Sequence, residues 1–347
     1  MACTPARASR SRSLRRGCRA SPPARASRRP SRARRLPDAP SAAGGPQGPA
    51  PAHVADRLAA AVAARGSQIV LGLDPDPLRL WHGPAGGDAA AVAGAVEAHC
   101  RAVVDAVADA VVAVKPQVAC FERLGAPGWA ALAATVAHAR DAGLFVLADA
   151  KRGDIDVSAA AYAQGFVGAT PVQGGSLPGL GADAMTVAPY MGLDTLRSFA
   201  AVARPDAALF VLVRTSNPGA ADLQDEPLAR GGTVWEHVAG LVARLGAEHV
   251  GPESGLSDIA AVVGATQPRH LARARELAPQ AIFLLPGVGA QGGRVEDLAP
   301  AFAPGRAAGL VTASRSIVRA HEQVGGSPAQ AALAEAQRLR EAAWALA

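Results

Sequence analysis

The stretch LADAKRGDI, residues 147–155, carries three charged side chains that could do chemistry, directly after an apolar run. These are Asp149, Lys151 and Asp154. The chain has 35 lysine and arginine residues, of which only Lys115 and Lys151 are lysines. An ammonium group can release a proton when its pKa is perturbed, whereas a guanidinium group in practice cannot. Because both lysines end strand-like apolar runs, we interpret them as functional groups rather than leftover surface charges.

The spacing of these residues predicts a compact group of alternating charges. On an extended strand, Asp149 and Lys151 are two positions apart and point to the same side. Asp154 falls in the following turn or at the start of the next helix, and Lys115 ends the preceding strand. Opposite charges about 4 Å apart attract by about 4 kcal/mol at an effective dielectric of 20. Such a network could hold a proton donor where a carbanion forms, or it could be a structural salt-bridge network.

A glycine-rich loop, LLPGVGAQGG at 284–293, is followed one strand later by ASRSI. Loops after the seventh and eighth strands commonly bind phosphate in barrels of alternating strands and helices. Glycines let backbone N–H groups close on a phosphate, and an arginine can grip its oxygens with two hydrogen bonds. Glycine-rich turns alone are common, so the prediction depends on the arginine. The predicted phosphate-binding residues are Gly287, Gly289, Gln291, Gly292 and Arg315.

Two further polar residues follow strand-like runs. Ser216, in RTSNPGA, could hydrogen-bond a polar heterocycle or belong to an ordinary turn. Asp74, in GLDPDP, could accept a hydrogen bond from a ribose hydroxyl or cap a helix. The eight histidines and four cysteines show no HxH, HExxH or CxxC spacing, so no metal site is predicted. Unpaired cysteines favour a reducing compartment, and we expect a cytoplasmic protein.

Eight continuously apolar runs are predicted to be strands, with alanine-rich helical stretches between them. Continuous rather than alternating hydrophobicity is typical of parallel strands buried on both faces. Eight such units in about 290 residues predict a (β/α)8 TIM barrel, whose catalytic groups lie at the carboxyl ends of its strands. A doubly wound sheet is the alternative, but the first strand lacks a GxGxxG turn. The predicted strands are 68–73, 110–115, 144–149, 184–188, 208–213, 259–263, 281–285 and 308–312.

The formal net charge of +6 divides unevenly along the chain. Residues 1–50 hold twelve arginines and one acid, whereas the remainder has a net charge of −5. We predict a disordered Arg/Ser/Pro-rich tail over 1–50 and a catalytic barrel domain over 51–347. The tail has the composition of a transit peptide or a nucleic-acid-binding arm, but we favour the interpretation that it is a segment without function. No apolar run approaches the length of a membrane span, so no membrane association is expected.

Several motifs together resemble the orotidine 5′-phosphate decarboxylase family, in particular its longer bacterial form (type 2). They are LGLDPDP, VKPQVACFE, FVLADAKRGDI, TVAPYMG, LVRTSNPGA, VVGAT, LLPGVGAQGG and ASRSI, and the resemblance covers roughly residues 54–345. It implies a TIM-barrel homodimer with active sites at the dimer interface. It also implies conversion of orotidine 5′-phosphate to UMP and CO2, the last step of de novo pyrimidine biosynthesis, without metal or organic cofactor.

The resemblance also implies roles for the charged residues. Lys151 corresponds to the proton donor to C6 of the pyrimidine, and Asp149 to the residue against the substrate carboxylate. Lys115 would bridge that aspartate and the ribose, and Asp154 would come from the partner subunit. Ser216 corresponds to the serine that contacts the pyrimidine amide.

The remaining site residues bind the rest of the nucleotide. Gln291 and Arg315 correspond to the phosphate grip, and Asp74 to the ribose contact. Where shorter family members carry threonine, this chain has Ser158, which keeps the hydroxyl.

Two alternatives stay open. A sister enzyme of the same barrel group, such as a hexulose-phosphate synthase, carries the same DxKxxD element but uses a divalent metal. A nucleic-acid-binding protein led by the arginine-rich arm is less favoured, because the body is acidic and lacks interleaved aromatic residues. We therefore expect no nucleic-acid partner.

Overall fold

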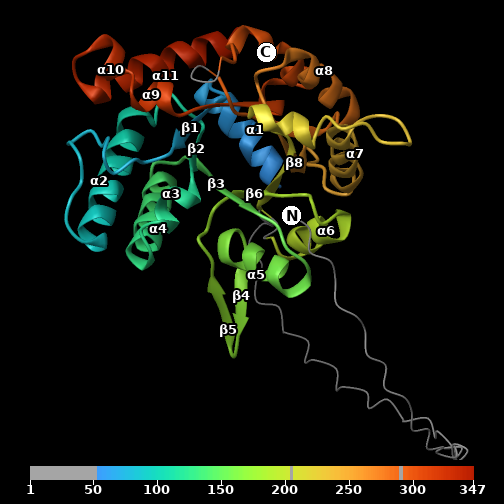
Figure 1. Ribbon diagram of the computed structural model, residues 1–347, viewed down its shortest axis with the longest axis horizontal. Coiled ribbons are helices and arrows are strands. Elements are labelled where there is room, and N and C mark those ends of the chain that lie inside the picture. Colours follow the sequence, from blue (N-terminus) through green and yellow to red (C-terminus); the bar gives the residue numbers. More distant parts are fainter. Residues whose placement is uncertain (1–52, 204–205, 289–291) are drawn as a thin grey trace, which may run out of the picture. The chain divides into compact units, whose positions relative to one another are not determined.

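The computed structural model describes residues 53–203, 206–288 and 292–347, and eight parallel strands close into a barrel within them (Figure 1). The strand order is β1-β10-β9-β8-β7-β6-β3-β2. Each strand coincides with one predicted run, so the TIM-barrel prediction is confirmed. The predicted tail over 1–50 lies outside the described residues. The strands are β1 Ile69–Leu73, β2 Ala113–Pro116, β3 Phe145–Arg152, β6 Ala184–Val187, β7 Ala208–Arg214, β8 Ser257–Val263, β9 Ala281–Leu285 and β10 Gly309–Ala313.

Helices surround these strands (Figure 1). Their caps follow local sequence rules: Asp88 accepts a hydrogen bond at the start of α2, and Thr233 with Glu236 forms a capping box at the start of α7. The α-helices are α1 Val54–Arg65, α2 Ala89–Val107, α3 Val118–Glu122, α4 Ala126–Asp141, α5 Asp156–Phe166, α6 Leu193–Val202, α7 Val234–Gly246, α8 Pro268–Leu277, α9 Arg315–Val318, α10 His321–Val324 and α11 Pro328–Trp344. The 3₁₀ helices in the described part of the chain are η1 Pro218–Asp222, η2 Val295–Phe302 and η3 Arg306–Ala308.

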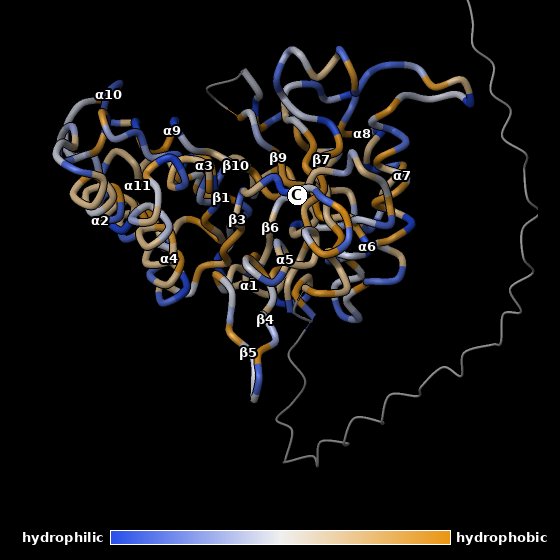
Figure 2. Tube along the Cα trace, turned by 60° about the horizontal axis from the view of Figure 1, so that its bottom comes forward, coloured by the Kyte–Doolittle hydropathy of each residue, from blue (hydrophilic) through white to orange (hydrophobic). Residues whose placement is uncertain are grey.

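Two hydrophobic cores explain why the strands are apolar on both faces. The outer core lies between the strands and the surrounding helices. The inner core fills the barrel with side chains such as Val70, Phe210 and Leu284, and helix α1 adds Leu58 and Val62 to it. The hydropathy colouring shows the same concentration of hydrophobic residues along the strands (Figure 2). The filled interior restricts open space to the ends of the barrel.

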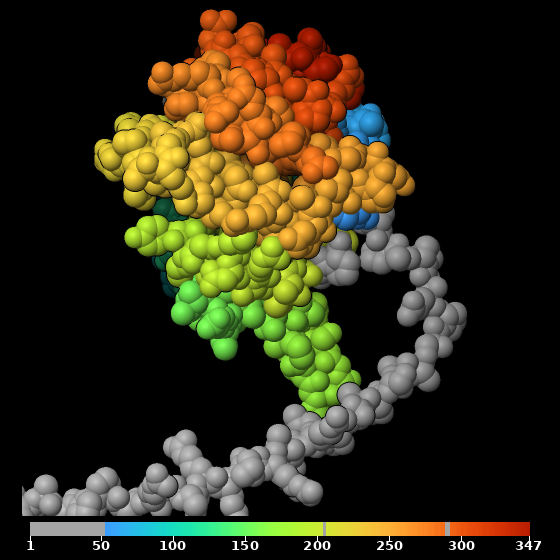
Figure 3. All heavy atoms as spheres, turned by 90° about the vertical axis from the view of Figure 1, so that its right-hand side faces the viewer, coloured from blue at the N-terminus to red at the C-terminus, as the bar shows by residue number. Residues whose placement is uncertain are grey.

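A two-stranded hairpin, β4 Ala169–Val172 with β5 Gly175–Pro178, stands out from the surface (Figure 3). The sequence analysis did not predict it. Its turn contains Gly174 at a φ of 86°, a conformation that favours glycine. Prolines in both strands hid the signal, because proline is depleted in strands other than edge strands.

Among the described residues, no helix combines the length and the hydrophobicity that a membrane crossing requires.

A buried arginine ties the last strands of the barrel together. Arg275 on α8 is only 7% exposed. Its guanidinium carbon lies 3.8 Å from the ring centre of Phe283, so the guanidinium stacks on that ring. Burial lowers the pKa of Arg275 to about 10. Its guanidinium donates hydrogen bonds to the carbonyl groups of Ala278, Pro279, Ala281, Ala301 and Ala308. One side chain therefore connects α8, β9 and the two 3₁₀ helices before β10.

Arg275→Met should lower the free energy of unfolding by about 3 kcal/mol, because it leaves buried carbonyl groups without donors. Urea unfolding followed by circular dichroism measures the loss. Arg273→Met is the matched control, since Arg273 lies on the same helix but its side chain is 49% exposed. The exposed ion pairs of Arg273 should contribute about 1 kcal/mol or less. Equal stabilities of the two variants would contradict the role given to Arg275.

Candidate active site

Polar residues at the carboxyl ends of the strands surround a cavity of about 430 Å³. Of the residues predicted from the sequence, seven line it: Asp74, Lys115, Asp149, Lys151, Ser216, Gly287 and Arg315. They lie at the carboxyl ends of β1, β2, β3, β7, β9 and β10 or just beyond them, and these elements are far apart in the sequence. The barrel therefore gathers into one cavity the residues that the sequence analysis assigned to one site.

The carboxylate of Asp149 is the centre of the charged group. Its Oδ2 atom accepts a hydrogen bond from Lys115 Nζ at 2.6 Å, and its Oδ1 atom accepts one from Lys151 Nζ at 2.6 Å. Gln117 Nε2 donates to Oδ2 at 3.1 Å, and Thr186 Oγ1 donates to Oδ1 at 2.9 Å. Each carboxylate oxygen thus has one ammonium donor and one neutral donor, which fixes the carboxylate's orientation.

This arrangement shifts the pKa values of its members. Burial raises the pKa of Asp149, but the charges and hydrogen bonds of Lys115 and Lys151 outweigh burial and hold the pKa well below its usual range. Burial lowers the pKa of Lys115, but the charges of Asp149 and Asp74 outweigh it and raise the pKa. At neutral pH Asp149 is therefore a carboxylate and Lys115 an ammonium.

Lys151 adopts an unusual backbone conformation. Its φ is 48°, in the left-handed region, and the pairing of β3 with β6 is irregular between Ala148 and Arg152. The N–H group of Lys151 donates to Thr186 Oγ1 at 2.8 Å. The predicted contact between Asp149 and Lys151 is present, but it does not arise from regular strand alternation. The irregularity turns the Lys151 side chain, which is 45% exposed, toward the cavity.

The residue after Lys151 anchors this irregular strand end. The guanidinium of Arg152 forms an ion pair with Glu122 on α3. It also lies 5.3 Å from the ring centre of Tyr162 and 5.5 Å from that of Phe166, both on α5. Cation–π contacts of this kind stabilise an arginine by about 0.5–2 kcal/mol each. Arg152 therefore fastens the strand end that carries Lys151 to two helices.

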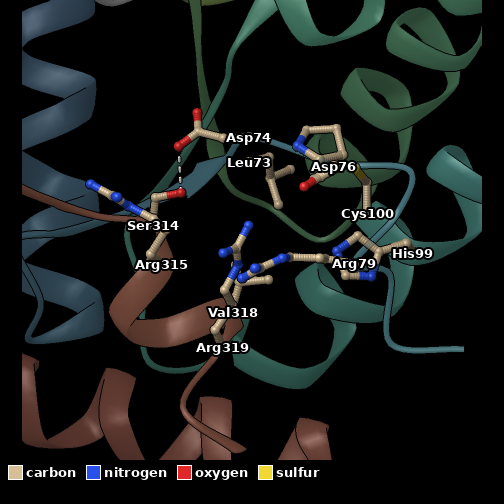
Figure 4. Close-up of a pocket in the computed structure, with 11 residues that line it drawn as sticks. Leu73, Asp74, Asp76, Arg79, His99, Cys100, Ser314, Arg315, Val318 and Arg319 are labelled. Atoms are coloured by element: carbon tan, nitrogen blue, oxygen red, sulfur yellow. Dashed lines mark hydrogen bonds between the residues drawn. The ribbon is translucent and has the colours of Figure 1, made fainter. Parts of the chain in front are cut away.

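Close packing places the remaining cavity residues. Ser314 Oγ donates to Asp74 Oδ2 at 2.5 Å, which joins the ends of β1 and β10 (Figure 4). Ser216 follows β7 in a loop that packs tightly on Gly264. A Cβ atom at Gly264 would lie 3.0 Å from the Ser216 Cα, so a larger residue there would press on the backbone that carries Ser216.

Three of the predicted residues that the structure describes, Asp154, Ser158 and Gly292, do not line the cavity of this single chain. Asp154 precedes α5, and its carboxylate accepts a hydrogen bond from the N–H of Ile155. Ser158 is exposed on α5, and Gly292 lies beyond the cavity. Gly289 and Gln291 lie outside the described residues.

Sequence reasoning missed two residues that contact Asp149 directly. Gln117 pairs in register with Asp149 across β2 and β3, and Thr186 is 1% exposed within β6. The available signal was a polar residue inside or beside an apolar strand. Each extends the set of groups that hold the central carboxylate.

The sequence profile of the Orotidine 5′-phosphate decarboxylase / HUMPS family matches residues 67–327. The chain belongs to this family. A Rhodopirellula baltica protein named orotidine 5′-phosphate decarboxylase is 41% identical over 276 residues, covering 78% of this chain and 89% of the relative. A Deinococcus radiodurans protein of the same name is 46% identical over 233 residues, covering 67% of this chain and 80% of the relative.

A solved structure agrees with the family assignment. The Leishmania donovani OMP decarboxylase matches with a TM-score of 0.60 and 33% identity, covering 82% of this chain and 98% of that one. Membership in the longer bacterial form stays a prediction.

Asp149→Asn should destabilise the protein by about 3–5 kcal/mol at pH 7, because the buried Lys115 ammonium loses its partner. Without that carboxylate, burial lowers the pKa of Lys115 below its value in the unfolded chain. The variant should therefore regain stability as the pH rises toward 10, where Lys115 loses its proton. Urea unfolding at pH 7 and at pH 9.5 measures both effects.

Asp105→Asn is the matched control, since Asp105 is a largely exposed carboxylate paired with His138. It should change stability by about 1 kcal/mol or less at either pH. An Asp149→Asn protein as stable as the wild type at pH 7 would contradict the central role of the carboxylate.

Proposed function

We propose that this protein decarboxylates orotidine 5′-phosphate to UMP and CO2, the last step of de novo pyrimidine biosynthesis, without a metal or organic cofactor. The observation that carries the proposal is the Lys115–Asp149–Lys151 group in a cavity at the barrel mouth. Membership in the family and the names of relatives more than 40% identical support it.

The chemical problem is the charge left on carbon. Loss of CO2 from C6 leaves a carbanion in the plane of the ring, which the ring's π system does not delocalise. The Lys151 ammonium, placed before the reaction, stabilises the developing negative charge and then donates its proton to C6. Guanidinium could supply charge but not the proton, which accounts for a lysine in a chain rich in arginine.

Asp149 has two effects in this mechanism. Its hydrogen bond orients Lys151, and its ionised carboxylate faces the carboxylate that the substrate loses. The repulsion between these two groups falls when CO2 departs, so it raises the energy of the bound substrate more than that of the transition state. Lys115 holds Asp149 in place from the buried side.

Contacts far from C6 supply binding energy for this arrangement. We assign the phosphate to Arg315 with Gln291 and the glycine loop, and the ribose to Asp74. Ser216 contacts the pyrimidine. Because these groups do not react, their binding energy can position the substrate against repulsion at the reacting carbon.

We further propose a homodimer in which Asp154 completes the site of the partner subunit. Asp154 and Ser158 do not reach the cavity of their own chain. Seven of the large exposed hydrophobic side chains among the described residues lie between residues 155 and 191, and exposed hydrophobic surface is typical of interfaces between proteins. They are Ile155, Val157, Tyr162, Val172, Leu177, Tyr190 and Met191, and two of them belong to the projecting hairpin.

We propose a cytoplasmic location for this biosynthetic enzyme. Cys100 and Cys120 are both free thiols, as expected in a reducing compartment.

Lys151→Arg and Lys151→Ala should each lower kcat for orotidine 5′-phosphate by about 1,000-fold or more, because both remove the proton donor. The fall in absorbance as the substrate is consumed measures the rate, with EDTA present throughout. Arg101→Ala, which removes an exposed cation on α2, is the control and should keep full activity. Activity that requires a divalent metal would favour the sugar-phosphate alternative, and near wild-type activity of Lys151→Ala would refute the assignment.

Mixing two inactive variants tests the shared site. In a heterodimer of Lys151→Ala with Asp154→Asn, one of the two sites has both wild-type residues. Random exchange between subunits should therefore restore about a quarter of the wild-type activity. Each variant alone should stay inactive, and no recovery after exchange would mean that Asp154 does not act across an interface.

A further inference from the structure

Three arginines surround a small pocket beside the active-site cavity (Figure 4). Arg79 lies in the loop after β1, Arg315 begins α9, and Arg319 follows α9. Within the described residues, none of these three guanidinium groups donates a hydrogen bond or forms an ion pair with a carboxylate. Arg79 and Arg315 are exposed and Arg319 is half-buried, so all three cations are accessible to a ligand from solvent.

The loop that carries Arg79 is held firmly in place. Arg123 donates to the carbonyl of Pro75 at 2.6 Å. The Trp81 indole N–H donates to the carbonyl of Val318 at 2.8 Å, and the Trp81 backbone N–H donates to His99 Nδ1 at 3.1 Å. These bonds join the loop to α9 and α2, so the fold itself keeps Arg79 close to Arg319.

Among the residues that the structure describes, the two acids in the pocket wall, Asp74 and Asp76, form no ion pair with these arginines and are outnumbered by them. Asp74 accepts the hydrogen bond of Ser314, and Asp76 accepts one from the backbone N–H of Leu78. Like charges held close together repel, and an anion between them removes the repulsion and gains charge-assisted hydrogen bonds. The arrangement therefore favours a ligand with negative charge.

The pocket is continuous with the active-site cavity. Asp74, Ser314 and Arg315 line both. Arg315 is the residue to which we assign the 5′-phosphate, and Arg79 and Arg319 extend the positive charge away from the cavity. The free volume of about 20 Å³ inside the pocket holds roughly one water, so a phosphate group would lie across its mouth.

We propose that Arg79 and Arg319 bind the terminal phosphate groups of pyrimidine nucleoside di- and triphosphates whose nucleoside monophosphate part occupies the active-site cavity. The inference rests on the proposed function, because it places the 5′-phosphate at Arg315. Such nucleotides form from the product UMP by phosphoryl transfer. They would compete with substrate, and the enzyme would slow as the products of that later reaction accumulate.

Calorimetric titration of the metal-free protein with UMP, UDP, UTP and inorganic phosphate, each separately, tests the inference. UDP should bind at least about tenfold more tightly than UMP, the gain expected from a new hydrogen bond between charged groups. The double variant Arg79→Gln/Arg319→Gln should lose this advantage while its affinity for UMP stays within about twofold. Inhibition of decarboxylation by the same nucleotides should follow the same order.

The control is the double variant Arg140→Gln/Arg244→Gln, which removes the same charge from α4 and α7, away from both pockets. It should keep the preference for UDP. Any of three results would overturn the inference. The wild-type protein could bind UDP and UMP with equal affinity, the Arg79/Arg319 variant could keep the preference for UDP over UMP, or inorganic phosphate could bind as tightly as UDP. Failure of the proposed function is a separate result, because it appears as absence of CO2 release from orotidine 5′-phosphate.

Discussion

The site depends on one buried carboxylate held between two ammonium groups. Asp149 is nearly inaccessible, and removing its charge from water would be costly without compensation. Lys115 and Lys151 supply that compensation from opposite oxygens. The compensation requires strand ends that meet at one edge, which parallel neighbours such as β2 and β3 provide. The charged group of Asp149, Lys115 and Lys151 therefore cannot form unless the barrel brings these strand ends together.

The two lysines both pair with the Asp149 carboxylate but differ in how exposed their side chains are. The Lys115 side chain is 8% exposed and Lys151 is 45% exposed. A buried ammonium with a raised pKa keeps its proton and acts as a fixed charge. An ammonium that reaches the cavity can meet a substrate. Both lysines thus pair with the same carboxylate, but one is a structural cation and the other a candidate proton donor. The strand irregularity at Lys151 accounts for this difference, because it exposes the Lys151 side chain to the cavity.

Sequence patterns were sufficient for the barrel because its strands are continuously apolar and its polar residues recur at strand ends. They also identified Asp149 and the two lysines, since lysine is rare in this chain. They did not reveal Thr186, which lies inside an apolar strand, or the left-handed conformation of Lys151. Both depend on pairing between β3 and β6, a contact distant in sequence. The hairpin at 169–178 was missed because its prolines and glycines are typical of loops.

Thr186 shows how the irregular strand and the charge group stabilise each other. Its hydroxyl accepts a hydrogen bond from the Lys151 backbone and donates its own to Asp149. A non-glycine residue in the left-handed region costs about 1–3 kcal/mol, so it persists only where surrounding contacts fix it. Here Thr186 fixes the backbone, and the ion pair with Asp149 fixes the side chain. Strain at Lys151 is therefore balanced by the same contacts that orient its ammonium, which keeps that group in position without rearrangement when a substrate arrives.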